Sequence, residues 1–135
     1  MTSFPLKIVT ADGLIFDSMA EKLIVRTVTG DMAVLARHIN CVSPLGMGRA
    51  IVEVNGERKS AACIGGMLSV KDGVVTLVPV TFEWAKDIDL ERAQKAAKNA
   101  EALLEKRDQL TKQEIAIAEA RLKRALIRQS VSKGE

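Results

Sequence analysis

The sequence contains few of the residues on which metal sites, disulfides and stacking surfaces depend. It has two cysteines, one histidine and four aromatic residues among 135. One histidine and two cysteines that lie far apart do not make a zinc ligand set. We expect Cys41 and Cys63 to be free, buried thiols in a reducing compartment. His38 lies three residues before Cys41, but no third group orients such a pair for catalysis, so a packed loop histidine beside a buried thiol is the better interpretation.

Several longer signals are missing as well. No apolar run approaches the ~18 residues that a membrane span needs, and the first residues have neither the basic nor the apolar region of a signal peptide. No G-x-x-x-x-G-K-[S/T] loop exists, and "GMGRAI" (46–51) lacks the third glycine of a dinucleotide loop. The net charge of +3 is too small to indicate nucleic acid or anionic lipid. We therefore expect a cytosolic protein, or one held at a membrane by a partner, without a phosphate loop.

The composition changes sharply near residue 84. Eight of the nine glycines lie before residue 74, and all prolines and aromatic residues lie before residue 85. We place a domain boundary there, which gives domains 1–84 and 85–135. The two domains have different hydrophobic patterns and are expected to differ in fold class.

The first domain has the pattern of short strands separated by turns. "EKLIVRTV" alternates apolar and polar residues and is rich in β-branched side chains. Asn55-Gly56 and Asp72-Gly73 each lie between two such segments, which is the strongest short signal for a β-hairpin. Many short strands at close spacing predict an antiparallel β-sandwich or barrel.

The second domain has the pattern of two helices. Residues 88–106 are rich in strong helix formers, with a thin apolar face composed mostly of alanine. Thr111 and Glu114 form a T-x-x-E capping box, which predicts a second helix start. Its apolar face is Ile115, Ala118, Leu122, Ala125 and Leu126. Because the connection is short, the helices should form an antiparallel hairpin, and because alanine buries little area, that hairpin should be only marginally stable.

Charged residues gather at the open end of this hairpin. If the chain folds back about Gln109, Arg92 comes level with Leu126, between Arg124 and Arg128, which share a face. Convergent arginines favour phosphate, and a helix N-terminus favours an anion. However, Asp89 before the first helix and basic residues late in the second are also what capping and the helix dipole favour. From the residues alone, a solvated charged hairpin is the simpler interpretation and an anion site is the alternative.

Several motifs resemble the epsilon subunit of F-type ATP synthases, over essentially the whole chain. "VTADGLIFD" (9–17) is similar to the family's first hairpin, "TGDMAVLARHINCVSPL" (29–45) to its G-x-x-G-I-L-P-G-H segment, and "GGMLSV" (65–70) to its Gly-Gly strand. Ala36-Arg37 departs from the usual Pro-Gly of that segment, and Asn99 stands near a position where some ATP-binding members have arginine. The resemblance implies an α+β chain, with a sandwich followed by a regulatory helical hairpin.

The resemblance also implies a nucleotide site. Ile88-Asp89-Leu90-Glu91-Arg92-Ala93 is a full match to the I/L-D-x-x-R-A motif of ATP-binding members, and "LKRALIR" (122–128) is similar to the end of their second helix. By this resemblance, regulatory ATP, with or without Mg²⁺, would be bound by the following residues: Glu83, Ile88, Asp89, Arg92, Ala93, Arg124 and Arg128. No other cofactor and no protein-ligated metal is implied.

The family implies a non-catalytic rotor subunit of a proton-translocating ATP synthase. The sandwich would bind the gamma subunit and the c-ring. The hairpin, when extended, would meet the catalytic beta subunit and the alpha subunit and inhibit ATP hydrolysis. Its basic contact residues would be Arg121, Lys123, Arg124 and Arg128. The expected location is peripheral, without a membrane span, on the cytoplasmic face of a bacterial plasma membrane rather than a plastid thylakoid.

Three alternatives differ in function class or in regulation. The first is an epsilon subunit whose hairpin inhibits or stabilises without sensing ATP. The second is a nucleic-acid adaptor with a basic last helix, but that helix has no aromatic residue for stacking and the sandwich carries equal numbers of basic and acidic residues. The third, a small-ligand enzyme built on the sandwich, has no identifiable catalytic set. Because the nucleic-acid adaptor lacks both stacking residues and a basic sandwich, we expect no binding of nucleic acid.

Overall fold

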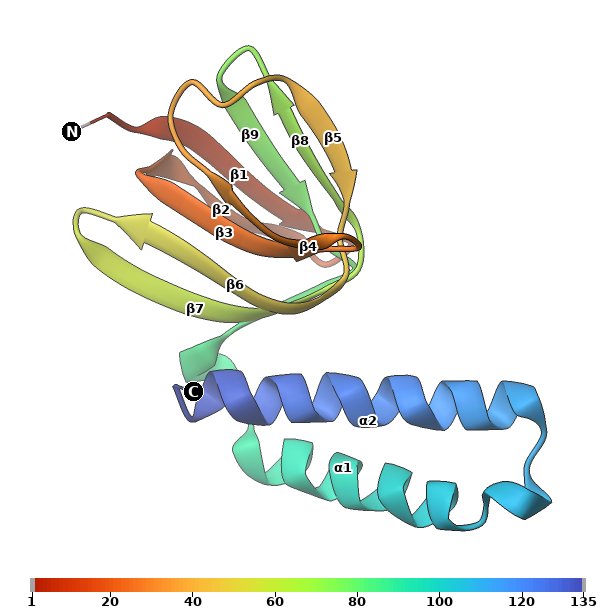
Figure 1. The fold of residues 1–135 in the computed structure, drawn as a ribbon. Helices are drawn as coiled ribbons and strands as arrows, with labels where there is room; N and C mark the ends of the chain where they lie inside the picture. The colour runs from red at the N-terminus through yellow and green to blue at the C-terminus, as the bar shows by residue number, and fades with distance from the viewer. Residues whose placement is uncertain (1, 135) are drawn as a thin grey trace. The chain divides into compact units, whose positions relative to one another are not determined.

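The computed structural model describes residues 2–134, which divide into two compact units, one ending at Trp84 and one beginning at Ala85. The first unit contains ten strands (Figure 1), which are β1 (Phe4–Thr10), β2 (Gly13–Ala20), β3 (Lys22–Thr27), β4 (Gly30–Val34), β5 (Cys41–Pro44), β6 (Met47–Val54), β7 (Glu57–Ile64), β8 (Met67–Lys71), β9 (Val74–Val78) and β10 (Thr81–Trp84). Over residues 85–134, the second unit contains helices and no strand. This confirms the predicted fold class.

The ten strands form a sandwich of two five-stranded sheets. One sheet has the order β2-β1-β9-β8-β5 and the other the order β10-β7-β6-β3-β4. All pairs are antiparallel except β1 with β9, which is parallel. This pair is the one exception in the predicted antiparallel sandwich. The parallel pair places the first strand of the chain next to the hairpin β8–β9.

The sandwich has one apolar core between its sheets. Alternate residues of β1, Leu6 and Ile8 among them, are almost fully buried, as are Leu23 and Val25 of β3 in the opposite sheet. This alternation follows from the period of two along a strand, which points successive side chains to opposite faces. At one edge, the ring of Trp84 on β10 packs edge-on against Phe82 and Phe16, with ring centroids 4.9 and 6.3 Å away. Phe16 belongs to the other sheet, so this aromatic cluster joins β2 to β10.

Both predicted tight hairpins are present. Asn55-Gly56 joins β6 to β7 and Asp72-Gly73 joins β8 to β9, and all four residues have positive φ, between 49° and 83°. Turns with two successive positive φ values match the twist of the flanking strands, and Asn, Asp and Gly tolerate them best. The turn sequences therefore set the register of these two hairpins.

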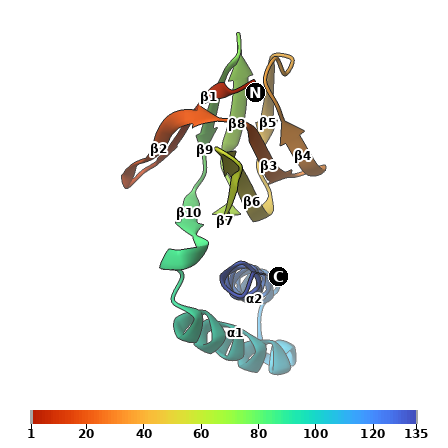
Figure 2. The same cartoon turned by 90° about the vertical axis from the view of Figure 1, so that its left-hand side faces the viewer.

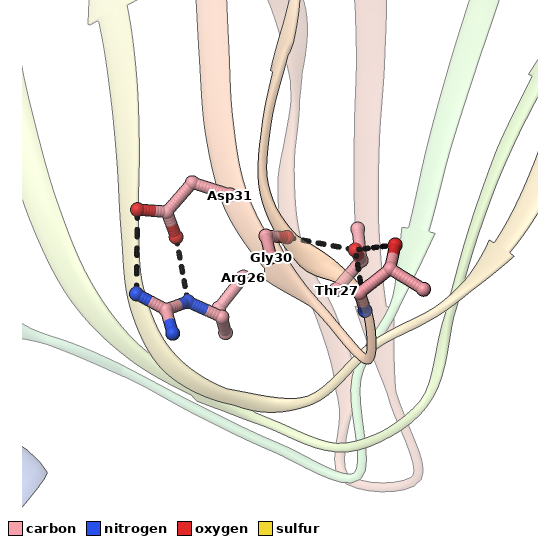
Figure 3. Close-up of polar contacts among 5 residues, drawn as sticks. Arg26, Thr27, Gly30 and Asp31 are labelled. Carbon is pink, nitrogen blue, oxygen red and sulfur yellow. Dashed lines mark hydrogen bonds and ion pairs between the residues drawn. The ribbon is translucent and has the colours of Figure 1, made fainter.

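The β3–β4 hairpin is held by polar side chains (Figure 3). Arg26 and Asp31 are directly opposite in register, and Arg26 Nε and Nη2 donate to the two carboxylate oxygens at 2.7 and 3.3 Å. The hydroxyl of Thr27 donates to the carbonyl oxygen of Gly30 at 2.7 Å and accepts from the amide of Thr29. The ion pair is solvent-exposed and contributes on the order of 0–1 kcal/mol. The ion pair and the Thr27 hydrogen bonds both lie at the turn end of this hairpin.

The second unit consists of a short 3₁₀ turn, η1 (Ala85–Asp87), then α1 (Leu90–Glu105), a second turn, η2 (Arg107–Gln109), and α2 (Lys112–Ser132). The capping box is present, because the Thr111 hydroxyl accepts from the Glu114 amide and the Glu114 carboxylate accepts from the Thr111 amide. The two helices lie side by side (Figure 2). Among residues 2–134, no helix is both long and apolar enough to cross a membrane.

The helices pack through alanine. The buried residues of α1 are Ala93, Ala97 and Ala100, and those of α2 are Ala118, Ala125 and Val131. The prediction of an alanine-rich hairpin is confirmed, but Leu126 is 47% exposed and does not belong to the buried face. Small side chains let helices approach closely, yet each buries little area. The hairpin therefore derives little hydrophobic stabilisation from the contact between its own helices.

The cysteines are free, as predicted, but only one of them is buried. Cys63 on β7 lies in the sandwich core, and burial raises its pKa from 9.0 to about 12. Cys41 at the start of β5 is half-buried, so the prediction of two buried thiols is wrong for Cys41. His38 is half-buried in the loop before β5, and its Nδ1 lies 2.9 Å from the carbonyl oxygen of Ile39.

Candidate functional site

The start of α1 is a capped helix N-terminus. Asp89 has an extended backbone, with φ −81° and ψ 98°, and its Oδ1 accepts from the Arg92 amide at 3.0 Å. The side chain of Ile88, just before the cap, is buried, and its amide donates to the carbonyl oxygen of Ala85. A short polar residue in extended conformation is the usual N-cap. Asp89 thus has a structural role in the hairpin.

A groove of about 280 Å³ lies between α1 and α2. From α1 it is lined by Ala96, Asn99, Ala100 and Leu103, and from α2 by Arg121, Arg124, Ala125 and Arg128. The floor is therefore apolar and the rim on α2 is strongly basic. None of these lining residues is acidic, so the groove carries a net positive charge from three guanidinium groups.

The three arginines follow one stripe of α2. Arg121, Arg124 and Arg128 are separated by three and four residues, the spacing that places side chains on one helix face. At 1.5 Å per residue, the row from Arg121 to Arg128 extends for about 10 Å along the axis. Arginine binds phosphate oxygens with its fork of N–H donors, often two at a time. The row thus matches an elongated polyanion better than a single small anion.

The opposite wall has its own stripe. Arg92 lies one turn before Ala96, and Ala96, Asn99 and Leu103 continue at three- and four-residue spacing. Asn99 is the only polar lining residue of α1, and its amide can both donate and accept hydrogen bonds. The alanines at the helix contact keep this groove narrow, since Ala100 and Ala125 are both buried and both form its floor.

The predicted site residues fall into three groups. Arg124 and Arg128 lie together in the groove. Ile88, Asp89, Arg92 and Ala93 lie in sequence at the start of α1, where Arg92 is exposed and does not line the groove. Glu83 lies in the other unit, on β10, opposite Ala62 of β7. The hypothesis that these residues bind one nucleotide stays a prediction.

Two residues of the groove had no place in the predicted nucleotide site. The family resemblance implies a role for Arg121 only in the basic contact helix, and it marks Asn99 only as a departure from arginine, yet both line the groove. The spacing of Arg121, Arg124 and Arg128 could have revealed the first, because it is a helical stripe. Lys123, the remaining contact-helix residue, does not line the groove.

The groove offers no protein ligands for a metal ion. Within residues 2–134 no group of three or more His, Cys, Asp or Glu side chains is arranged to bind one. Any Mg²⁺ in the groove would be coordinated by the oxygens of an anionic ligand and by water, which is how this ion is commonly bound beside phosphates.

Comparisons with known proteins cover both units. The profile of the family described as ATP synthase, Delta/Epsilon chain, beta-sandwich domain matches residues 3–85, and that of the long alpha-helix domain of the same chain matches residues 86–133. The chain is 39% identical over 132 residues to an ATP synthase epsilon chain of Bacillus velezensis, covering 98% of both chains. It is 35% identical over 131 residues to an ATP synthase epsilon chain of Caldanaerobacter subterraneus, covering 96% of this chain and 94% of the relative.

Solved structures agree with these matches. A chain in the structure of the Euglena gracilis mitochondrial ATP synthase, which comprises OSCP, F1 and the c-ring, superposes with a TM-score of 0.82 at 26% identity. The superposition covers 99% of this chain and 82% of that chain. A chain of the central stalk and c-ring of the Tetrahymena thermophila mitochondrial ATP synthase superposes with a TM-score of 0.53 at 13% identity, over 62% and 68% of the two chains, which shows similarity of fold alone.

Proposed function

The chain belongs to the ATP synthase delta/epsilon family, as a non-catalytic epsilon subunit of the central stalk, and from this premise we propose that its helical hairpin binds ATP in the arginine-lined groove and acts as an ATP-biased regulator of hydrolysis. The observation that carries the proposal is the row of Arg121, Arg124 and Arg128 along one groove without an acidic lining residue. The triphosphate would lie along this row, and Arg92 and Asp89 would define the end of the site at the start of α1.

Binding of ATP would stabilise the folded hairpin by mass action. A ligand that binds only the folded state adds RT ln(1 + [L]/Kd), about 2.7 kcal/mol at a concentration one hundred times Kd. The buried side chains of α1 and α2 are almost all alanine, so the hairpin starts from a low intrinsic stability. An added free energy of this size is enough to shift a two-state equilibrium roughly one hundredfold.

Release of the hairpin would make it an inhibitor. Arg121, Lys123, Arg124 and Arg128 would then be available to an acidic surface of the catalytic beta subunit, with the alpha subunit beside it. Three of these four residues line the ATP groove. Occupation of the groove and inhibition would therefore compete for the same arginines, and low ATP would favour the inhibited state.

The sandwich offers a surface for the gamma subunit. On the outer face of the sheet β2-β1-β9-β8-β5, Leu14 pairs with Val9, while Val78 pairs with Met67 and Met67 with Pro44. Since β1 lies beside β9, these five residues form one apolar row across five strands, and each is exposed or half-exposed. A contiguous exposed apolar row marks an interaction surface. We assign this row as the binding surface for the gamma subunit, and the c-ring as the second rotor partner. The complex would lie at the cytoplasmic face of a bacterial membrane and translocate protons.

This surface can be tested with two variants of one strand. Met67→Asp places a charge in the apolar row and should weaken binding to purified gamma subunit at least tenfold. Ser69→Asp, two residues along the same face of β8, is the matched control and should change binding less than threefold. Equal effects of the two substitutions would exclude the row as the gamma-binding surface.

The nucleotide site is tested by calorimetry on the full chain. We expect saturable 1:1 binding of ATP, with and without Mg²⁺. The affinity for ATP should fall at least tenfold in Arg124→Ala and in Asp89→Ala/Arg92→Ala. Lys123→Ala removes the same charge from the same helix outside the groove and should bind ATP within twofold of the unmodified chain. Binding that is equally weak in Lys123→Ala would mean a general charge effect and not a site.

The second candidate is an epsilon subunit whose hairpin inhibits without sensing ATP. The hydrogen bond from the Arg92 amide to Asp89 favours it, because a capping role explains Asp89 without a ligand. Absence of heat and of a thermal shift at millimolar ATP, together with inhibition of hydrolysis that depends on α2, would establish this alternative.

A further inference from the structure

The turn that joins β6 to β7 carries a chemically labile pair. Asn55 is followed by Gly56, and both residues are exposed. Among residues 2–134, apart from the chain neighbours of Gly56, no atom lies within 4 Å of the place that a Cβ on this glycine would take. The backbone nitrogen after the asparagine is therefore unshielded, since glycine has no side chain. The pair combines two features that favour spontaneous deamidation, an Asn-Gly sequence and access to water.

Deamidation would proceed through a cyclic imide. The Gly56 nitrogen attacks Cγ of Asn55, the new C–N bond closes a five-membered ring, and the side-chain nitrogen of Asn55 leaves as ammonia with the proton that Gly56 loses. Water then breaks one of the two ring C–N bonds, which gives aspartate or isoaspartate. Isoaspartate adds one carbon to the main chain, so a two-residue turn between paired strands cannot accommodate it unchanged.

The closed turn does not allow this ring to form. Asn55 and Gly56 have φ values of 52° and 80°, as in a type I′ turn. The first central residue of that turn has a ψ of about +30°. At this ψ the Cβ of Asn55 and the nitrogen of Gly56 lie on opposite sides of the Cα–C bond, whereas the ring requires them on the same side. Cyclisation therefore needs the turn to open, and its rate follows the population of the open form.

Glu21, in the bend between β2 and β3, contacts this turn. Its Oε1 accepts a hydrogen bond from the Gly56 amide at 3.1 Å, and its own amide donates to the carbonyl oxygen of Glu53 on β6 at 2.8 Å. Its Oε2 is buried and has no hydrogen-bond partner within residues 2–134. In that part of the chain, the Gly56 amide is thus the one hydrogen-bond partner of the carboxylate.

This contact is directed at the reacting atom. The Gly56 nitrogen is the nucleophile of the cyclisation, and it must lose its proton to attack. A carboxylate that accepts from this N–H stabilises the protonated form, and its negative charge opposes the charge that develops on nitrogen. The bond therefore slows cyclisation in two ways, because it keeps the turn closed and keeps the proton on nitrogen.

We propose that Asn55 is a spontaneous deamidation site and that the Glu21 carboxylate protects it. A chain that loses this contact converts at residue 55 and gains a negative charge between Glu53 and Glu57 of the same hairpin. As isoaspartate, residue 55 also disrupts the turn that sets the pairing of β6 with β7. Deamidation at this position then records opening of the sandwich at the β2–β3 bend.

The test is incubation of the full chain at neutral pH, followed by mass spectrometry of the tryptic peptide 50–58. The same chain unfolded in urea gives the rate of an unprotected pair, and we expect the folded chain to deamidate at least tenfold more slowly. Glu21→Ala should accelerate deamidation of the folded chain about five- to tenfold, the effect of losing one partly exposed hydrogen bond to a charged group. Glu21→Gln, which keeps an acceptor oxygen but no charge, should accelerate it about two- to fivefold.

Two control variants separate this contact from general effects. Glu57→Ala removes an exposed carboxylate next to the turn that does not accept from Gly56, and should leave the rate within twofold. Gly73→Ala strains the other tight hairpin of the sandwich, between β8 and β9, and should also leave the rate within twofold. Urea unfolding of each variant verifies that it is folded during the incubation.

The proposal is overturned if both Glu21 variants deamidate no faster than the unsubstituted chain, and a slower rate would mean that the carboxylate acts as a base on Gly56. Acceleration of the same size in Gly73→Ala would assign the effect to general destabilisation. The same result in Glu57→Ala would assign it to loss of negative charge near the turn, and either outcome would remove the role of Glu21. Equal rates in the folded and the urea-unfolded chain would mean that the turn gives no protection.

Discussion

The side-chain amide of Gln129 donates a hydrogen bond to the backbone carbonyl oxygen of Ala93, with N and O 3.4 Å apart. A hairpin folded about Gln109 would place Ala93 level with Ala125, so the observed partner lies four residues, or about one turn, further along α2. Side chains lean toward the N-terminus of their helix, and for α2 that is the loop end. The same lean agrees with the lining of the groove, where Arg124 and Arg128 lie with Ala96 and Asn99.

Removal of this bond should loosen the hairpin selectively. We expect Gln129→Ala to lower the local stability of α1 and α2 by about 0.5–1.5 kcal/mol, the net contribution of one hydrogen bond. Amide hydrogen exchange should show faster exchange of the α1 amides by about two- to tenfold, with the sandwich amides unchanged. Gln113→Ala, in the exposed first turn of α2, is the control and should change neither. Identical exchange in both variants would mean that the Gln129 bond contributes nothing.

Local sequence signals predicted the local structure well. The Asn55-Gly56 and Asp72-Gly73 turns, the Thr111–Glu114 capping box and the alanine contact of the helices all follow from residues close in sequence. The groove was only partly predictable. The sequence predicts Arg124 and Arg128 in a site at the open end of the hairpin, but the lean of side chains toward the loop end of α2 extends the groove as far as Arg121.

Nonlocal features were not predictable from the same signals. The parallel pairing of β1 with β9 joins residues nearly seventy positions apart, and neither strand contains a signal that selects its partner. The short strands β4, β5 and β10 lie at or next to chain turns and are all sheet edges. Edge strands are short and need little alternation, since one side of each has no neighbour. The sequence alone therefore does not predict which side chains of these edge strands are buried, because that depends on the order of the strands in each sheet.

Arg37 has a backbone conformation that favours glycine. Its φ is 67°, in the left-handed region, which costs a non-glycine residue about 1–2 kcal/mol. The family resemblance places glycine here, and this chain retains the turn without it. We expect Arg37→Gly to raise the free energy of unfolding by about 0.5–1 kcal/mol, because relief of strain exceeds the entropy cost of glycine. Urea unfolding measures the change. Arg37→Ala keeps the Cβ and should be neutral, so an equal gain in both variants would contradict a conformational cause.

Gly66, by contrast, admits no side chain. Its φ is 99°, and a Cβ at this position would lie 2.6 Å from Cα of Pro79 and closer still to the carbonyl oxygen of Val78. We expect Gly66→Ala to destabilise the sandwich by about 2–4 kcal/mol, the sum of backbone strain and overpacking. The control is Gly73→Ala, with φ 83° and no atom within 4 Å of the added Cβ, which should cost only about 1 kcal/mol. Equal shifts of the urea midpoint would mean that φ alone, and not the contact with Val78 and Pro79, explains the glycine.

The buried thiol of Cys63 should give the sandwich an alkaline limit. Burial raises the pKa of Cys63 from 9.0 to about 12, so the folded state keeps the proton where the unfolded chain releases it. Below pH 9 both states are protonated and the thiol causes no loss of stability, whereas between pH 9 and about 12 the unfolded state is favoured by roughly 1.4 kcal/mol per pH unit. We expect the stability advantage of the unmodified chain over Cys63→Ala, measured by urea unfolding, to be constant from pH 7 to 8 and to shrink by roughly 1 kcal/mol by pH 10. Lysine titration affects both proteins alike and cancels in this difference. Parallel pH profiles up to pH 10 would mean that the Cys63 thiol ionises as readily in the folded protein as in the unfolded chain.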